Sequence, residues 1–399
     1  MTDFGQTASN HVRQLAVGIG SRTLGSAGHH AAAGYITAHF AEAGLAVERQ
    51  EIPCPNWAEI SSTLELDGQR LDAYANTFSP SGEASAPTVP LGTLAELRAA
   101  DLAGRIPIFY GALAQHEIAA KGAIYVSERD REIIEILEAR RPAALITVNP
   151  SLHARWRLIE DYDLALPSVT VTASTGLKLV ERAGAAVRLN VHTRREPSHT
   201  ANLIGRLPGR RPERLVICAH YDSKVDTPGA YDNAAGVAVL LTLVQALAGT
   251  PHTHTLEFIS FTGEEVYGLG DMEYARRLGD DFSQIVAALN IDGPGPRLAT
   301  NTLATFAASG AFQAMAAEVA GRYPGVALVD PWPASDHYIF YSHGVPSLAI
   351  TSLGIKDQYH TPFDTIDWLS PDKLAEAVQL ALDLVNAIDA QSLAWGRPA

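Results

Sequence analysis

The chain contains 399 residues, of which 47% are hydrophobic and 19% are charged, with 32 glycines and 23 prolines. This is the composition of an ordinary globular protein, and it excludes a disordered chain, a collagen-like repeat and a disulfide-stapled miniprotein. The length predicts two or three domain-sized units. A net charge of −14 repels phosphate backbones and anionic lipids, so we expect neither nucleic acid nor a membrane as a partner.

The two cysteines, Cys54 and Cys218, are too few for a disulfide framework. The chain does not begin with a basic segment, an apolar run and a small-residue cleavage site, so we expect a cytoplasmic protein, or a secreted one if a leader has been removed. The longest apolar stretch, residues 236–248, contains Gln245 and is shorter than the roughly 18 residues that a bilayer demands. We therefore predict that this stretch is a buried helix.

Predicted elements in the first half of the chain change character after Pro53. Before it, the apolar spacing predicts helices at residues 8–16 and 29–43, followed by a strand at 45–52. After it, short β-like runs at 106–110, 144–148 and 168–171 are mixed with helical segments. We predict an inserted, mainly β domain at residues 56–196, which separates two parts of one larger domain, residues 1–55 and 197–399.

From about residue 200, apolar strands alternate with helices. The predicted strands are residues 215–219, 255–261, 285–291 and 347–351, and the predicted helices are residues 233–248, 271–278 and 371–389. Such alternation indicates the α/β class, with a mixed, mostly parallel sheet flanked by helices on both faces. The last helix has a predicted core face made of Leu374, Ala377, Val378, Leu380, Ala381 and Leu384.

Polar residues with catalytic potential follow the ends of these strands. They are His220, Asp222, Asp232, Glu264, Glu265, Asp292 and His360. Since ligand sites in parallel sheets form beyond the carboxyl ends of strands, we expect these side chains to converge. Imidazoles and carboxylates without cysteine suit a borderline ion such as Zn²⁺. Taken singly, each residue is explained as well by a surface loop or a helix N-terminus, but their joint occurrence favours a metal centre.

The motifs that hold these residues resemble a known family. They are His220-Tyr221-Asp222, Asp232-Asn233-Ala234-Ala235-Gly236, Thr262-Gly263-Glu264-Glu265, Asn290-Ile291-Asp292, Ser335-Asp336-His337 and Tyr359-His360-Thr361-Pro362. Their order and spacing are similar to those of the di-zinc metallopeptidases that include aminopeptidase Y, bacterial leucyl aminopeptidases and glutamate carboxypeptidase. Residues 22–28 are similar to the segment that opens the peptidase domain of that family. Residues 101–106 and 167–172 are similar to the start and end of the protease-associated domain that many members carry as an insert.

The resemblance implies a zinc exopeptidase fold and a role for each motif residue. Asp232 would bridge two zinc ions, with His220 and Asp292 completing one site and Glu265 and His360 completing the other. Glu264 would be the general base acting on a water shared by the metals, and Asp222 would orient His220. Cobalt or manganese are possible substitutes for zinc. The implied activity is removal of N-terminal residues from a peptide substrate, and the oligomeric state stays open.

Two alternatives remain at this stage. A carboxypeptidase or other amidase of the same fold would need a basic residue in its pocket, for which Arg276 and Lys356 are candidates. A non-catalytic binding protein of the wider family would have lost metal ligands, whereas every expected ligand type is present here. Trp332 stands near the position where some members have a tyrosine, and we expect it to form an aromatic wall. We predict surface positions for His29, His30, His252 and His254.

Overall fold

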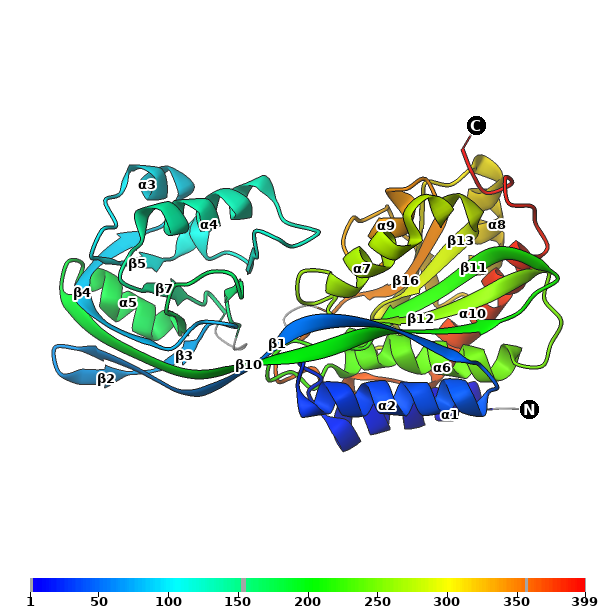
Figure 1. Ribbon diagram of the computed structural model, residues 1–399, viewed down its shortest axis with the longest axis horizontal. Helices are drawn as coiled ribbons and strands as arrows, with labels where there is room; N and C mark the ends of the chain where they lie inside the picture. Colours follow the sequence, from blue (N-terminus) through cyan, green and yellow to red (C-terminus); the bar gives the residue numbers. More distant parts are fainter. Residues whose placement is uncertain (1–2, 152–155, 356–357, 399) are drawn as a thin grey trace. The chain divides into compact units, whose positions relative to one another are not determined.

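The computed structural model describes residues 3–151, 156–355 and 358–398. The chain divides into two compact units: unit 1 comprises Met1–Pro53 and His199–Ala399, and unit 2 comprises Cys54–Ser198 (Figure 1). Two long strands, β1 (Val47–Leu66) and β10 (Ala186–Leu207), contribute residues to both units. All the motif residues from His220 to His360 belong to unit 1.

Unit 1 is built on a mixed sheet. Its strand order is β15 (Val326–Leu328), β14 (Thr300–Phe306), β16 (Ser347–Leu353), β13 (Ile285–Ile291), β11 (Arg211–His220), β12 (His254–Phe261) and the last part of β10. β16, β13, β11 and β12 run parallel, while β14 and β10 pair antiparallel with their neighbours β16 and β12. The predicted fold class, a mostly parallel sheet flanked by helices, is confirmed.

Helices cover both faces of this sheet. α2 (Ala27–Glu42) and α6 (Ala235–Leu247) lie on one side in Figure 1, and α7 (Leu269–Leu278) and α9 (Tyr338–Tyr341) lie on the other. α1 (Phe4–Val12), α8 (Gly310–Ala320) and α10 (Pro371–Asp389) share the large apolar core with α6. The predicted core face of the last helix is confirmed, because all six of its residues are buried.

The central helix α6 is apolar on every side because protein surrounds it. The stretch Ala230–Leu247 is long and apolar enough to cross a membrane by composition, yet 83% of it is buried inside the unit. A helix that is apolar all round and enclosed in this way is a core helix. The prediction of a buried helix here is confirmed. Cys218 on the neighbouring strand β11 is buried as well.

Unit 2 has a sheet and core of its own. The strand order is β10, β4 (Gly82–Leu91), β5 (Ile106–Phe109), β7 (Leu145–Val148), β9 (Ser168–Val171) and β3 (Ala73–Ala75). Short strands β2 (Gln69–Leu71), β6 (Ile118–Ala119) and β8 (Ile159–Glu160) and helices α3 (Leu94–Ala99), α4 (Glu128–Arg140) and α5 (Ala173–Glu181) complete it. Its likeness to a protease-associated domain stays a prediction.

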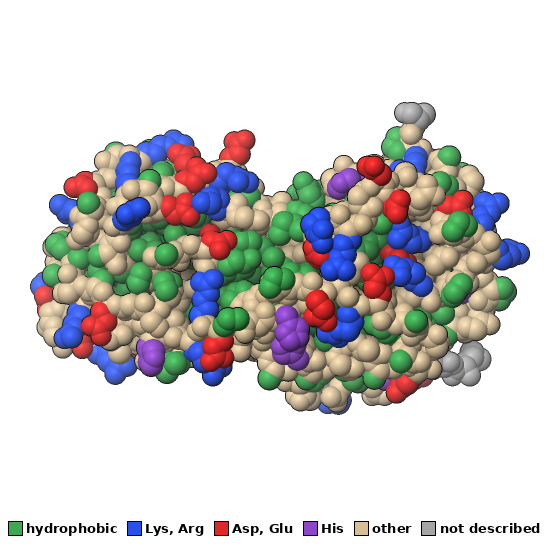
Figure 2. Space-filling model, viewed as in Figure 1, with side chains coloured by type: hydrophobic (Ala, Val, Ile, Leu, Met, Phe, Trp, Pro, Cys, Tyr) green, Lys and Arg blue, Asp and Glu red, His purple; other side chains and the backbone are tan. Residues whose placement is uncertain are grey.

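Three histidines that were predicted at the surface are buried, so that prediction is wrong. Each imidazole has a polar partner inside the protein. His29 Nδ1 lies 3.0 Å from the Arg22 carbonyl oxygen, His252 Nε2 lies 3.1 Å from that of Leu247, and His254 Nδ1 lies 3.3 Å from Asp389 Oδ1. On the face shown in Figure 2, acidic and basic side chains are interspersed on each unit instead of forming a field of one sign.

Candidate metal centre

The parallel strands of unit 1 end at one edge of the sheet. His220 is the last residue of β11 and lies in register with Phe261, the last residue of β12. β13 ends at Ile291, immediately before Asp292. This shared edge brings the residues that follow the three strands together, as expected for open parallel sheets.

Asp232 reaches the same edge from the short turn that precedes α6. The N–H groups of Tyr231 and Asp232 donate hydrogen bonds to the two carboxylate oxygens of Asp364, at 2.7 and 3.0 Å. Asp364 is buried, and burial raises the pKa of its carboxyl to about 7. Asp364 was not predicted from the sequence, although its position four residues after His360 was a signal that could have found it.

Asn233, the next residue, ties the start of α6 to the end of β13. Its side-chain N–H donates to the Ile291 carbonyl at 2.9 Å, and its Oδ1 accepts from the N–H groups of Gly236 and Gly293 at 2.8 and 3.2 Å. A Cβ atom at Gly236 would lie 2.2 Å from the Ile291 carbonyl oxygen, so the close approach requires glycine. Asn233 follows Asp232 and Ile291 precedes Asp292, so the hydrogen bond between Asn233 and Ile291 ties the two aspartates together.

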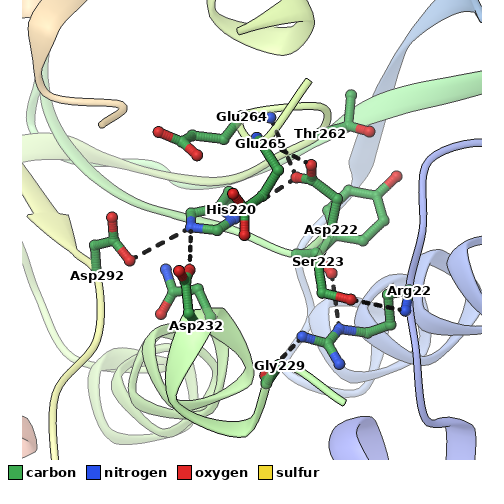
Figure 3. Close-up of polar contacts among 12 residues, drawn as sticks. Arg22, His220, Asp222, Ser223, Gly229, Asp232, Thr262, Glu264, Glu265 and Asp292 are labelled. Carbon is green, nitrogen blue, oxygen red and sulfur yellow. Dashed lines mark hydrogen bonds and ion pairs between the residues drawn. The ribbon is translucent and has the colours of Figure 1, made fainter. Parts of the chain in front are cut away.

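Two groups of three side chains meet at this edge and share Asp232. One is His220, Asp232 and Asp292, and the other is Asp232, Glu265 and His360, with the ligand-type atoms of each group within 4.8 Å of one another. His220 Nε2 lies 3.2 Å from Asp232 Oδ1 and 3.4 Å from Asp292 Oδ1 (Figure 3). His360 Nε2 lies 3.1 Å from Asp232 Oδ2 and 3.2 Å from Glu265 Oε2. The structure thus brings all five predicted ligands together.

The donor set fits zinc. Each group offers one imidazole nitrogen and two carboxylate oxygens, which are ligand types that Zn²⁺ accepts. In addition, Glu265 Oε1 is buried and has no hydrogen-bond partner in the part of the chain that the structure describes. Three carboxylates this close together in a half-buried site need positive charge to balance them.

Charge interactions within the groups move the pKa values of their members. Burial alone lowers the pKa of the His220 imidazole, but the carboxylates of Asp292, Asp222 and Asp232 together raise it well above its usual range. Burial opposes ionisation of Asp232, yet the two imidazoles hold the pKa of its carboxyl well below the usual range. The pKa of Glu264 is raised, first by burial and then by neighbouring carboxylates that include Glu265.

Asp222 links the loops that follow β11 and β12. Its Oδ1 accepts the N–H of Glu264 and its Oδ2 accepts the N–H of Glu265, both at 3.2 Å. His220 Nδ1 lies 3.6 Å from Asp222 Oδ1, which is an ion-pair separation and exceeds a hydrogen bond. The sequence predicted only that Asp222 orients His220. The hydrogen bonds from Asp222 to the backbone of Glu264 and Glu265 were not predicted.

A chain of polar residues supports Asp292 from the side of α9. The Ser335 hydroxyl donates to Asp292 Oδ2 at 2.6 Å, and the Asn290 side-chain N–H donates to Ser335 Oγ at 2.8 Å. His337 Nε2 lies 2.9 Å from the carbonyl oxygen of Trp332, and burial lowers the pKa of His337 to about 4. The neutral imidazole therefore donates through Nε2 and accepts from Asn290 through Nδ1.

The site borders a cavity of about 650 Å³. The described residues that line it are Tyr231, Asp232, Glu264, Glu265, Asp292, Thr302, Val329, Asp330, Trp332, Ala334, Ser335, Thr351, Ser352, Leu353, Ile355, Tyr359 and His360. The size is in the range of small-ligand sites, and the lining combines apolar walls with convergent carboxylates. Trp332 is one of the wall residues, while Lys356 lies outside the described residues.

Comparisons with known proteins agree with this geometry. Residues 202–385 match the model of peptidase family M28. Aminopeptidase YwaD of Bacillus subtilis (strain 168) is 25% identical over 396 residues, which cover 95% of this chain and 83% of that protein. The solved structure of BSAP, a zinc aminopeptidase from Bacillus subtilis, shares the fold with a TM-score of 0.78 at 21% identity, covering 98% of both chains. A peptidase M28 precursor from Shewanella amazonensis gives 0.79 at 22% identity, covering 98% and 96%.

The family match spans α6, the parallel strands and all five proposed ligand positions, from β10 to α10. It therefore falls on unit 1, the unit that holds both groups of three side chains. Through this unit, the chain matches peptidase family M28.

Proposed function

We propose that this protein is a zinc-dependent aminopeptidase that removes residues from the N-terminus of peptides. The observation that carries the proposal is the position of Asp232, whose two carboxylate oxygens face two different imidazoles, those of His220 and His360. A carboxylate shared in this way suits a pair of metal ions, an arrangement that aminopeptidases use. The names of YwaD and BSAP, an aminopeptidase and a zinc aminopeptidase, support the same activity.

Five side chains hold the metals in this proposal. His220 and Asp292 would hold one zinc ion, Glu265 and His360 would hold the other, and Asp232 would contribute to both. Zinc bound here supplies Lewis acidity, which lowers the pKa of water and polarises a carbonyl group. Cobalt or manganese can replace zinc where the same nitrogen and oxygen donors accept them.

Glu264 is the proposed general base. It lines the cavity and is adjacent in the chain to Glu265, and Asp222 fixes its backbone N–H. In Figure 3 its carboxylate extends toward the side of the site where Asp292 lies. A Glu264 carboxylate oxygen takes the proton of the attacking water and returns it to the leaving amine, which keeps the proton inside the cavity throughout.

The charge of the cavity favours an N-terminal over a C-terminal substrate end. Five carboxylates line it, those of Asp232, Glu264, Glu265, Asp292 and Asp330, and no lysine or arginine is found among its described lining residues. Such a lining attracts the ammonium group of a peptide N-terminus and repels a terminal carboxylate. Arg276, a candidate for the carboxypeptidase alternative, pairs with Glu273 and is not part of the lining.

The test is mass-spectrometric analysis of the products that purified protein forms from a mixed peptide pool. The incubation is made before chelation, after chelation and after zinc is restored. We expect stepwise loss of N-terminal residues that stops with the chelator and returns with zinc. Loss of C-terminal residues would support the carboxypeptidase alternative, and no cleavage by protein that holds two zinc ions would support a binding role.

A further inference from the structure

A buried ammonium group lies directly behind Glu265. Lys224 follows β11 in the loop that leads to α6, and it is 8% exposed. Its Nζ donates a hydrogen bond to the Glu265 carbonyl oxygen at 3.0 Å and lies 3.8 Å from Glu265 Oε2. Taking a lysine ammonium out of water is unfavourable unless hydrogen-bond acceptors and negative charges compensate it. Glu265 supplies both to Lys224.

Lys224 is held in place at its backbone as well. Its carbonyl oxygen accepts the N–H of Thr227 at 3.3 Å. Ser223, the preceding residue, accepts the backbone N–H of Arg22 through Oγ at 3.0 Å. The lysine side chain therefore starts from a loop that is fixed by hydrogen bonds. Its ammonium group can restrain Glu265 for this reason.

The lysine does not serve as a pocket cation. It is absent from the described residues that line the cavity, whereas Glu265 is among them. The ammonium group is therefore not among the described groups that line the cavity. This placement separates Lys224 from the basic residue that a carboxypeptidase would need.

Glu265 depends on such restraints for its orientation. Its N–H donates to Asp222 Oδ2 at 3.2 Å, and its Oε2 lies 3.2 Å from His360 Nε2. Lys224 restrains the same residue at its carbonyl oxygen and places a positive charge beside its carboxylate. Glu265 is thus held by Asp222 and His360 on one side and by Lys224 on the other.

We propose that Lys224 is a positioning residue that holds Glu265 in the orientation needed by the group Asp232, Glu265 and His360. It thereby sets how tightly one of the two zinc ions is held, while the group His220, Asp232 and Asp292 keeps its own ion. This inference rests on the proposed zinc function. Outer partners that orient metal ligands commonly change metal affinity about 10- to 100-fold when removed.

The test measures zinc bound per chain during titration with a chelator. Lys224→Met keeps the length of the side chain and removes its charge and donors, Lys224→Gln keeps one donor group, and Lys224→Arg keeps the charge. Lys373→Met is the matched control, since Lys373 forms a comparable pair with Glu376 on α10, at 3.2 Å. We expect Lys224→Met to lose one zinc ion at a chelator concentration about 10-fold or more below that needed for wild type and Lys373→Met. Lys224→Gln should be intermediate and Lys224→Arg closest to wild type.

A second readout separates positioning from a general effect on folding. Thermal unfolding is measured for each variant without metal and with zinc. The proposal expects metal-free Lys224→Met to unfold near the wild-type temperature, with a smaller rise on adding zinc. It is overturned if the variant releases both ions with the wild-type profile, or if the Met and Gln variants are both unfolded without metal. Wild-type protein that binds no zinc would instead overturn the proposed function.

Discussion

Asp222 accepts the backbone N–H of Glu264 at 3.2 Å through Oδ1, across 42 residues of sequence. The same carboxylate accepts the N–H of Glu265 through Oδ2. Because the carboxylate is acceptor-only, both of its oxygens suit these two donors. A single side chain at the end of β11 therefore fixes the loop that carries the proposed base and one proposed ligand.

Asp222→Asn should lower both catalytic rate and zinc affinity. The amide keeps one acceptor but presents an N–H₂ group to the second backbone donor, which disturbs the loop that holds Glu264 and Glu265. We expect each quantity to fall about 10- to 100-fold. The measurements are kcat on an N-terminal reporter substrate and zinc retention against a chelator. An Asp222→Asn variant that matches wild type in both would contradict this role.

Glu264→Gln should leave metal binding intact and slow turnover. Glutamine has nearly the shape of glutamate but cannot take a proton from water, so the loss reports the proton transfer itself. A positioned base contributes about 10²- to 10⁴-fold, and we expect kcat to fall by that factor. Zinc per chain, measured on the same sample, serves as the control. A near-normal rate with two bound zinc ions would remove Glu264 from the mechanism.

Apolar runs and the residues that follow them were sufficient to predict the central strands and the side chains at their ends. Runs such as residues 285–291 and 347–351 identified β13 and β16, and the residues that follow the strands were the ones that the sheet edge brings together. β14 was not anticipated, because three polar residues stand at its start. Asn301 and Thr302 are fully buried there, and Asn301 donates to the Lys373 carbonyl at 2.9 Å.

Tertiary contacts could not be predicted from the sequence, even for residues that lie in or near a motif. Asp364, Ser335 and Lys224 touch proposed ligands only through loops that meet in the fold. The same holds for the buried histidines, since an imidazole such as that of His29 is stabilised by a carbonyl and by Thr200 and Thr262, far along the chain. Composition and periodicity do not report contacts of this kind.

Arg22 is a buried guanidinium that binds four backbone carbonyl groups. It donates to the carbonyl oxygens of Tyr221, Gly20, Pro228 and Gly229 at 2.9, 3.1, 2.6 and 2.8 Å. Figure 3 shows the contact with Gly229. Burial lowers its pKa to about 10, so it remains charged near neutral pH. It thus fixes the loop between β11 and the turn that carries Asp232.

Arg22→Met should destabilise unit 1 strongly, because it leaves these buried carbonyl groups without donors. We expect the free energy of unfolding to fall by about 3–5 kcal/mol, measured by urea denaturation. Arg276→Met is the control, since Arg276 is exposed and pairs with Glu273 on the surface of α7, where the substitution should change stability little. Equal effects of the two substitutions would show that the Arg22 contacts are not stabilising.

Asp271 and Asp336 form a buried pair of carboxyl groups near the site. Both are fully buried, and none of their four oxygens has a hydrogen-bond donor in the described part of the chain. Burial raises the pKa of Asp271 to about 7, and burial together with the Asp271 charge raises that of Asp336 well above its usual range. The pair therefore holds a proton in the folded state at pH values where the unfolded chain has released it.

This proton makes stability depend on pH. With a folded pKa raised above the unfolded value of 3.8, the contribution of Asp271 is fully present below pH 4 and is lost as pH rises to about 7. Asp271→Asn supplies a permanent N–H donor to Asp336, so the variant should be more stable than wild type at pH 8, by about 2–4 kcal/mol, and should lose this advantage near pH 4. Urea unfolding from pH 4 to 8 measures the difference, with Asp280→Asn, an exposed position on the same unit, as the charge-matched control. If Asp271→Asn is no more stable than the control at pH 8, the two carboxyl groups do not share a proton.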